Sequence, residues 1–250
     1  MDEKRVKIKY RPREQFRSFH NRKQRWSVLV CHRRAGKTVT TLNDLIRGAV
    51  NECNPEGRYA FIFSQRNQAK DTAWRYLRRY ADPLLAKPPN ESELRVDLVN
   101  GSMIRLYGAD NPDALRGPYL DGVVLDEFAD MKPEVWHEVV RPMLADRRGW
   151  ATFIGTPKGK NEFYKLYQNA LKDEAWFHMI LKASESGIIA GDLPHLARPP
   201  ARRCRHHPHV LVAGPHARPD VVETILRAAN PTHLARRFLI HGDRSGSNNV

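Results

Sequence analysis

One stretch of the chain decides its fold: Trp26-Ser27-Val28-Leu29-Val30-Cys31-His32-Arg33-Arg34-Ala35-Gly36-Lys37-Thr38. Its apolar, β-branched first part predicts a buried strand, and apolar residues recur at helical spacing after it. A strand, a turn and Gly-Lys-Thr at the start of a helix are typical of a phosphate-binding loop. We therefore expect Lys37 to reach the β and γ phosphate oxygens and Thr38 to hold Mg²⁺, while backbone N–H groups face the phosphates. The loop is unusual, because Cys31 stands at its first glycine position and two arginines lie inside it.

Two more apolar runs end in polar residues that fit this site. Val123-Val124-Leu125 leads into Asp126-Glu127, at the end of a buried strand, where ligands of open α/β sheets gather. There Asp126 can hold Mg²⁺ through its waters, and Glu127 can polarise the water that attacks the γ-phosphate. Alone, this pattern would indicate only a strand that ends in two solvated acids. The third run, residues 151–157, ends in Gly155-Thr156-Pro157 and predicts a γ-phosphate sensor at Thr156.

Strands and helices alternate over the rest of the first 188 residues. Short apolar strands are expected at residues 59–63 and 176–181, and helices over residues 69–80, from about Pro133 and over residues 163–171. Asn100-Gly101 between two short apolar runs predicts a hairpin. Apolar strands that alternate with helices predict an α/β fold with a mostly parallel central sheet flanked by helices.

The chain of 250 residues has a formal net charge of +14, which favours a polyanionic partner, most simply nucleic acid. A solvated basic surface is the alternative, and composition does not separate the two. No apolar run is long enough to span a bilayer and no signal peptide opens the sequence, so we expect a soluble, cytoplasmic protein. The three scattered cysteines form neither a disulfide framework nor a paired metal site.

The first 25 residues are densely basic and include Gln15. A side-chain amide both donates and accepts hydrogen bonds, so Gln15 is a candidate contact to an adenine edge, upstream of the phosphate loop. An ordinary polar surface residue is the alternative interpretation.

With the three strand ends in register, the chain resembles the ATPase domain of the large terminase subunit of tailed bacteriophages, the motor that packages genomic DNA. The resemblance covers residues 1 to about 188 and includes the glycine-poor, arginine-bearing phosphate loop. It rests further on four segments: Gln68-Ala69-Lys70-Asp71-Thr72-Ala73-Trp74, Leu115-Arg116-Gly117, Arg141-Pro142 and Gly155-Thr156-Pro157-Lys158-Gly159-Lys160-Asn161. It implies a P-loop NTPase fold of the ASCE type that uses ATP and Mg²⁺.

The resemblance also implies roles for individual residues. The nucleotide-binding set is Gln15, Arg33, Arg34, Ala35, Gly36, Lys37 and Thr38, the metal ligands are Thr38 and Asp126, and the catalytic set is Glu127, Arg116, Arg33, Arg34 and Thr156. Thr156 is expected to couple hydrolysis to movement. Arg116 is the candidate arginine finger that reaches the nucleotide of a neighbouring subunit. Arg33 or Arg34 acting in cis is one alternative, and Arg116 as a surface salt-bridge partner is another.

By the same resemblance, the partners are double-stranded DNA, a homo-oligomeric ring of identical subunits, a portal protein and a small terminase subunit. The resemblance places DNA packaging in the host cell cytoplasm and implies no membrane. It also implies that ATP hydrolysis drives translocation of the DNA. The rival enzyme is a DEAD-box-like helicase or another P-loop DNA translocase. A helicase needs a second motor domain, which the remaining residues are too few to supply.

Residues 189–250 depart from this family, because large terminases normally continue into a nuclease domain. This segment has no lysine after Gly191 and holds seven of the eleven histidines. We expect an Arg/His/Pro-rich tail that is disordered, out of frame or foreign, and no nuclease activity. A truncated or frameshifted fragment that binds nucleotide or DNA without packaging is therefore an alternative. Zinc at Cys204–His209 lacks a second ligand pair, and Asp243 lacks the converging carboxylates of a two-metal nuclease.

Overall fold

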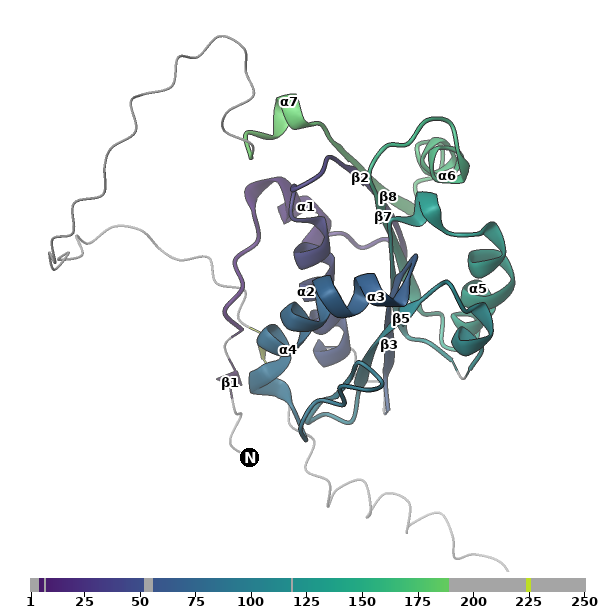
Figure 1. Cartoon of the computed structure of the whole chain (residues 1–250). Helices are drawn as coiled ribbons and strands as arrows, with labels where there is room; N and C mark the ends of the chain where they lie inside the picture. Colours follow the sequence, from purple (N-terminus) through teal and green to yellow (C-terminus); the bar gives the residue numbers. More distant parts are fainter. Residues whose placement is uncertain (1–4, 7, 52–55, 118, 189–223, 226–250) are drawn as a thin grey trace, which may run out of the picture.

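A seven-stranded sheet forms the centre of the structure, a computed structural model that describes residues 5–6, 8–51, 56–117, 119–188 and 224–225 (Figure 1). Its strands are β2 (Trp26–Cys31), β3 (Arg58–Phe63), β4 (Arg95–Asp97), β5 (Met103–Gly108), β6 (Gly122–Asp126), β7 (Trp150–Gly155) and β8 (Trp176–Leu181). They lie in the order β4-β5-β3-β6-β7-β2-β8, and only β4 and β5 pair antiparallel. This arrangement confirms the predicted mostly parallel α/β fold.

Burial explains why the central strands read as apolar runs in the sequence. All five residues of β6 are buried, and β2, β3 and β7 are buried after their first residue. Parallel strands that are covered on both faces have this pattern. The edge strand β8 instead alternates half-buried and exposed residues from Phe177 onward. The phosphate loop is therefore attached to one of the buried central strands.

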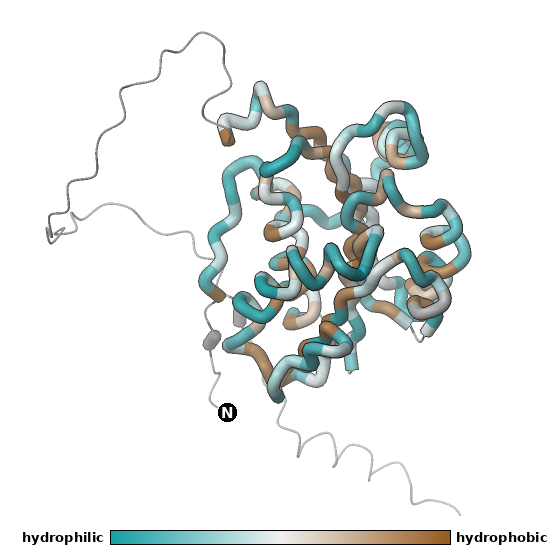
Figure 2. The backbone as a smooth tube through the Cα atoms, viewed as in Figure 1, coloured by the Kyte–Doolittle hydropathy of each residue, from teal (hydrophilic) through white to brown (hydrophobic). Residues whose placement is uncertain are grey.

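Helices cover both faces of the sheet. In Figure 1, α1 (Arg17–His20), α2 (Lys37–Asn51), α3 (Arg66–Gln68) and α4 (Arg75–Ala81) lie on one face, and α5 (Arg141–Met143) and α6 (Glu162–Ala170) on the other. Residues Leu42, Leu45 and Ile46 of α2 belong to one buried apolar cluster, and Phe163 of α6 belongs to a second. Figure 2 shows apolar positions along the strands between the helices and hydrophilic positions on outer turns.

Shorter helical segments complete the described fold. Two π-type segments precede α4 and α5, several 3-10 turns lie in the connections, and α7 follows β8. Their bounds are Ala69–Trp74 and Val135–Val140 for the π-type segments, Glu14–Phe16, Asp82–Leu84, Pro112–Leu115 and Phe128–Asp130 for the 3-10 turns, and Ala183–Ser186 for α7.

Both the hairpin and the helices predicted from the sequence are confirmed. Val96 of β4 lies opposite Ile104 of β5, and the connection turns at Gly101, whose φ of +86° lies in the backbone region that favours glycine. The helix predicted over residues 69–80 contains one feature that its periodicity did not indicate. Its first part, Ala69–Trp74, is π-type, and only the second part is the α-helix α4.

The predicted tail falls almost entirely outside the described residues. Of residues 189–250 the structure describes Thr224–Ile225 (β9), which pairs antiparallel with Arg5–Val6 (β1). Cys204–His209 and Asp243, weighed above for zinc and nuclease chemistry, lie outside the described part. The domain boundary at residue 188 stays a prediction. Over the residues that are described, no helix combines the length and apolar character needed to cross a membrane.

Candidate active site

The phosphate loop joins β2 to α2 at the carboxyl edge of the sheet. Because β2 ends at Cys31 and α2 begins at Lys37, residues 32–36 form the loop. Two of its residues have left-handed backbone conformations, Arg34 with a φ of 63° and Gly36 with a φ of 95°. Glycine adopts this conformation without steric cost, whereas for arginine it costs roughly 1–2 kcal/mol. Strain of this kind is common at functional sites.

The side chain of Arg13, which precedes β2, forms hydrogen bonds to the backbone of this loop. Its Nη1 donates to the carbonyl oxygen of Ala35 at 2.6 Å and to that of Arg34 at 3.4 Å. A Cβ added at Gly36 would lie 3.3 Å from the same nitrogen, so the guanidinium is a second reason for glycine at this position. Sequence reasoning missed Arg13 and counted it only among the basic residues of the N-terminal segment. No spacing rule connects it with a carbonyl 22 residues later in the chain.

The strand order β6-β7-β2 brings the three predicted strand ends together. β7 lies between the other two strands, with Ile154 opposite Asp126 and Gly155 opposite Val30. The hydroxyl of Thr38, in the first turn of α2, donates to Asp126 Oδ2 at 3.0 Å. The two predicted metal ligands are therefore in direct contact.

Lys37, Glu127 and Thr156 form a second set of contacts at the same edge. Lys37 Nζ lies 3.0 Å from Glu127 Oε1 and donates to Thr156 Oγ1 at 3.3 Å. Thr156 donates to Glu127 through its backbone N–H at 3.2 Å and through its hydroxyl at 3.3 Å. Glu127 itself is left-handed, with a φ of 52°, a further strained residue at this site. Residues predicted separately for phosphate binding, water activation and sensing thus form one hydrogen-bonded group.

Asp126 is almost completely buried, at 4% exposure. Burial raises the pKa of its carboxyl to about 6, with Glu127 adding to the rise while Lys37 and Thr38 oppose it. A divalent cation would stabilise the charged carboxylate that burial disfavours. The described residues contain no cluster of three or more His, Cys, Asp and Glu suited to a metal. Mg²⁺ in nucleotide sites needs only one or two carboxylates beside substrate phosphates, so the oxygen atoms of Thr38 and Asp126 fit this ion.

The other predicted residues take different positions. Gln15 is half-buried, and its Nε2 donates to the carbonyl oxygen of Ser186 at 2.6 Å, which uses one of the two N–H donors of the amide. Arg33 and Arg34 are exposed on the loop. Arg116 is exposed after the turn Pro112–Leu115 and lines a separate cavity of about 290 Å³. The residues lining that cavity include neither Lys37 nor Glu127. The roles of all these residues stay predictions.

A cavity of about 180 Å³ opens beside the phosphate loop. Its lining residues are Lys9, Tyr10, Arg11, Arg13, Gly36, Val39, Thr40 and Tyr80. The rings of Tyr10 and Tyr80 meet edge to face with centroids 5.9 Å apart, and burial raises the pKa of Tyr10 to about 12. Sequence reasoning did not propose either tyrosine, because one lies in an irregular basic segment and the other ends an amphipathic helix.

Comparison with known proteins identifies the family. The family described as terminase large subunit, T4likevirus-type, N-terminal, matches residues 30–227. The large terminase subunit of Thermus phage G20c is 50% identical over 69 residues, which are 28% of this chain and 14% of that relative. The matched segment therefore spans about a seventh of the relative's length.

Two solved structures have the same fold. The ATPase domain of the Thermus phage P74-26 large terminase is 24% identical, with a TM-score of 0.62, and the match covers 72% of this chain and 84% of that one. The large terminase of another thermophilic bacteriophage, solved in complex with ADP, is 17% identical, with a TM-score of 0.56, over 71% of this chain and 45% of that one. At these identities the likeness concerns the fold alone, and it confirms the predicted α/β fold with a mostly parallel central sheet flanked by helices.

Proposed function

Because this chain belongs to the family of T4likevirus-type terminase large subunits and matches their N-terminal part, we propose that it is the ATP-hydrolysing motor domain of a DNA-packaging terminase. The observation that supports this most is the meeting of two sets of contacts, Lys37–Glu127–Thr156 and Thr38–Asp126. The backbone N–H of Glu127 joins the two sets, because it donates to Asp126 Oδ1 at 2.9 Å. The large terminase that was solved in complex with ADP supports a nucleotide as the ligand. ATP hydrolysis at this group would drive translocation of double-stranded DNA.

Lys37 Nζ is paired with Glu127 Oε1 at 3.0 Å. In the proposed reaction the γ-phosphate takes the place of Glu127 as the anion that Lys37 binds. Glu127 is then released to accept a hydrogen bond from the attacking water, which it orients and polarises. The backbone N–H groups of residues 35–38 hold the β-phosphate at the start of α2, and Arg13 fixes the loop through the carbonyl oxygen of Ala35.

Thr38 and Asp126 would hold Mg²⁺ through the two oxygen atoms that now share a hydrogen bond. The ion supplies positive charge to the phosphate oxygens. Thr156 bonds to both Lys37 and Glu127, so any exchange of partners between these two changes its hydrogen bonds. We infer that Thr156 transmits loss of the γ-phosphate to β7, which is the coupling role expected of it.

The base would lie in the 180 Å³ cavity beside Gly36, where Tyr10 and Tyr80 offer aromatic surface. Gln15 remains the proposed adenine contact: one N–H of its amide is bonded to the Ser186 carbonyl, and the second N–H and the amide oxygen are the groups that would contact the base. For the arginine finger we propose Arg116 acting on a neighbouring subunit, since it lines a cavity that holds no residue of its own phosphate site. Arg33 and Arg34, exposed on the loop, are the alternatives in cis.

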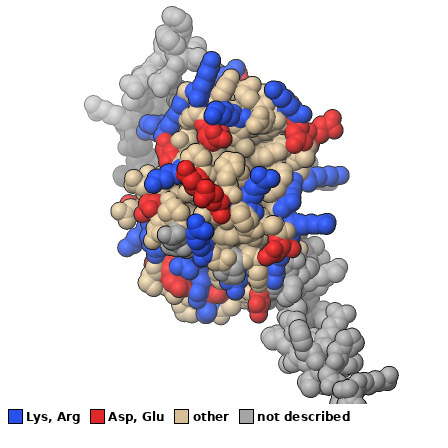
Figure 3. Space-filling view, turned by 90° about the vertical axis from the view of Figure 1, so that its right-hand side faces the viewer, with Lys and Arg blue, Asp and Glu red and all other residues tan. Residues whose placement is uncertain are grey.

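The proposed partners are double-stranded DNA, further copies of this chain in a ring, a portal protein and a small terminase subunit, in the host cell cytoplasm. The net charge of +14 supports a polyanionic partner. On the face that carries α5 and α6, Figure 3 shows Lys and Arg interspersed with Asp and Glu. The excess of positive charge therefore does not form a uniform basic surface there.

Three single variants test the proposed chemistry. Glu127→Gln keeps the shape of the side chain but removes its negative charge, so it is expected to bind ATP and to lose about 10²–10⁴-fold in hydrolysis rate. Lys37→Ala is expected to lose both binding and hydrolysis. Glu174→Gln, at an exposed position after α6, is the control and should behave like the unchanged chain. Normal turnover by Glu127→Gln would exclude its role in activating water.

A further inference from the structure

A cleft of about 410 Å³ lies at the edge of the sheet opposite the proposed nucleotide site. Arg25 precedes the first residue of β2 and Trp150 is the first residue of β7, so the cleft is at the amino ends of these strands. The six residues of β2 separate it from the phosphate loop by roughly 20 Å. The cleft is therefore not an extension of the proposed ATP site.

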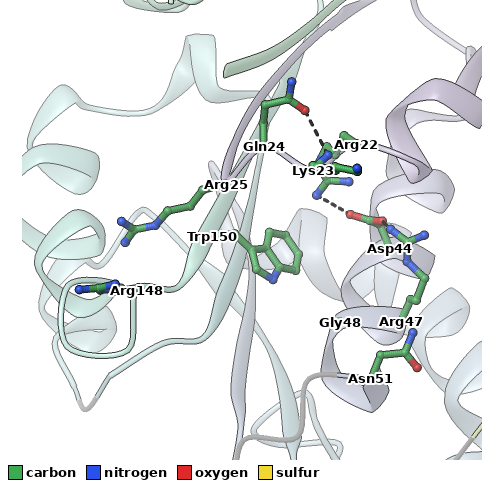
Figure 4. Close-up of a pocket in the computed structure, with 10 residues that line it drawn as sticks. All are labelled: Arg22, Lys23, Gln24, Arg25, Asp44, Arg47, Gly48, Asn51, Arg148 and Trp150. Carbon is green, nitrogen blue, oxygen red and sulfur yellow. Dashed lines mark hydrogen bonds and ion pairs between the residues drawn. The ribbon is translucent and has the colours of Figure 1, made fainter. Parts of the chain in front are cut away.

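Five of the ten residues that line the cleft are basic, and only Asp44 is acidic. Figure 4 shows Arg25 and Arg148 on one side of Trp150, and Arg22, Asp44 and Arg47 on the other. Lys23 is the fifth basic residue. Such an excess of positive charge within one cavity favours a bound anion.

Asp44 does not neutralise the whole cleft, because its carboxylate is already paired with Arg22 and Arg47. The carboxylate lies 2.7 Å from Arg22 Nη2 and 2.6 Å from Arg47 Nη2, and His20 Nδ1 lies 3.3 Å away. Lys23, Arg25 and Arg148 have no carboxylate partner among the described residues. Three positive charges of the cleft thus have no counter-charge from the residues that the structure describes.

The geometry of the basic side chains adds two observations. The guanidinium of Arg25 is held by hydrogen bonds to the carbonyl oxygens of Gly149 at 2.7 Å and Leu144 at 3.1 Å. Burial lowers the pKa of Arg25, and the like charge of Arg148 lowers it further. On the other side, the Arg22 side chain is only 7% exposed, and its buried Nε has no hydrogen-bond partner within the described part of the chain. That nitrogen is closed off from the surface, so the side chains that can donate to an anion in the cleft are the exposed Lys23 and Arg148.

We propose that this cleft binds a phosphate group of the DNA backbone. That the phosphate belongs to DNA rests on the proposed function. The cleft would be a DNA-binding site that is separate from the ATP site. Arginine and lysine are the side chains that most often bind DNA phosphates, and such contacts carry no sequence preference. The last turn of α2 lines the cleft through Arg47, Gly48 and Asn51. At the phosphate loop the N-terminus of α2 holds the nucleotide phosphates; none of the residues that line the cleft begins a helix, so we assign its anion to the DNA backbone.

A double variant, Lys23→Ala with Arg148→Ala, tests this proposal in the full chain. Both side chains are exposed, and neither belongs to the catalytic group. The matched control is Lys132→Ala with Lys172→Ala, which removes the same charge at exposed positions outside the cleft. Affinity for a DNA duplex of random sequence is measured over a range of salt concentrations. We expect the cleft variant to bind DNA more weakly. The slope of log affinity against log salt concentration should decrease in magnitude by about 1–2, because each lost phosphate contact reduces it by roughly 0.9.

The control should keep the salt slope of the unchanged chain, and both variants should hydrolyse ATP at its rate without DNA, which also verifies folding. If the cleft variant and the control have the same slope, the cleft is not a DNA contact while the proposed function stands. If the unchanged chain binds no DNA, both proposals fail in their choice of partner. A third arm uses Lys37→Ala with labelled ATP. Residual ATP binding that disappears when Lys23 and Arg148 are also replaced would overturn DNA as the source of the phosphate.

Discussion

Asp44→Asn is expected to be among the most destabilising single substitutions in this chain. The carboxylate is 2% exposed, and its partner Arg22 is 7% exposed. Asparagine keeps the shape but removes the negative charge, which leaves Arg22 buried with no anion beside it. Removing one partner of a buried ion pair costs about 3–5 kcal/mol, mostly because the remaining charge is uncompensated. We expect a loss of this size in the free energy of unfolding.

Equilibrium unfolding in urea is the suitable assay, since urea is uncharged and does not screen ion pairs as guanidinium does. Asp97→Asn is the matched control. Asp97 pairs with Lys87 at 3.4 Å and Arg95 at 3.2 Å, but its side chain is 24% exposed, and ion pairs near the surface contribute less than about 1 kcal/mol. A loss for Asp44→Asn no larger than that for Asp97→Asn would refute the argument from burial.

The same carboxyl fixes the sign of a pH effect. Burial by itself would raise the pKa of Asp44, but the hydrogen bond from His20 and the charges of Arg22 and Arg47 bring it below its ordinary value of 3.8. The unfolded chain therefore binds the proton first as the pH falls. The stabilisation by Asp44 is complete above pH 3.8 and is lost as the pH falls through the lower folded value. The difference in unfolding free energy between the unchanged chain and Asp44→Asn should be largest near neutral pH and shrink in acid.

Three further predictions concern other parts of the molecule. If Arg116 is a finger in trans, hydrolysis per subunit should rise with protein concentration, and Arg116→Ala should remove that rise, by up to about 10³–10⁵-fold; a flat concentration dependence would favour Arg33 or Arg34. Gly122→Ala would place a Cβ 2.5 Å from Trp150 Cε2, and a calorimetric scan should record a loss of about 1–3 kcal/mol from overpacking. Burial raises the pKa of Cys31 to about 12, so iodoacetamide at mildly alkaline pH should modify it only after unfolding, as peptide mass spectrometry would detect.

The sequence was sufficient to predict the group around Lys37 because each part of it is local. An apolar run followed by polar residues marks a strand end, and in parallel strands all such ends lie at one edge of the sheet. That rule brings Thr38, Asp126 and Thr156 to the same edge without knowledge of the strand order. The order itself, with β7 between β6 and β2, depends on pairings between distant segments. The spacing of residues along the chain carries no information on those pairings.

The same limit explains why Arg13 and the basic cleft were missed. Arg22, Arg25, Arg47 and Arg148 come from three separate segments, and only the fold brings them to one cavity. Net charge was a poor guide to this cavity, because what matters is which charges are already neutralised. The carboxylate of Asp44 is paired with Arg22 and Arg47. The positive charges that remain for an anion are therefore those of Lys23, Arg25 and Arg148. A basic composition predicts that the protein binds some anion. Which basic side chains are open to that anion depends on the fold, because in this cleft the buried carboxylate of Asp44 pairs with two of the five.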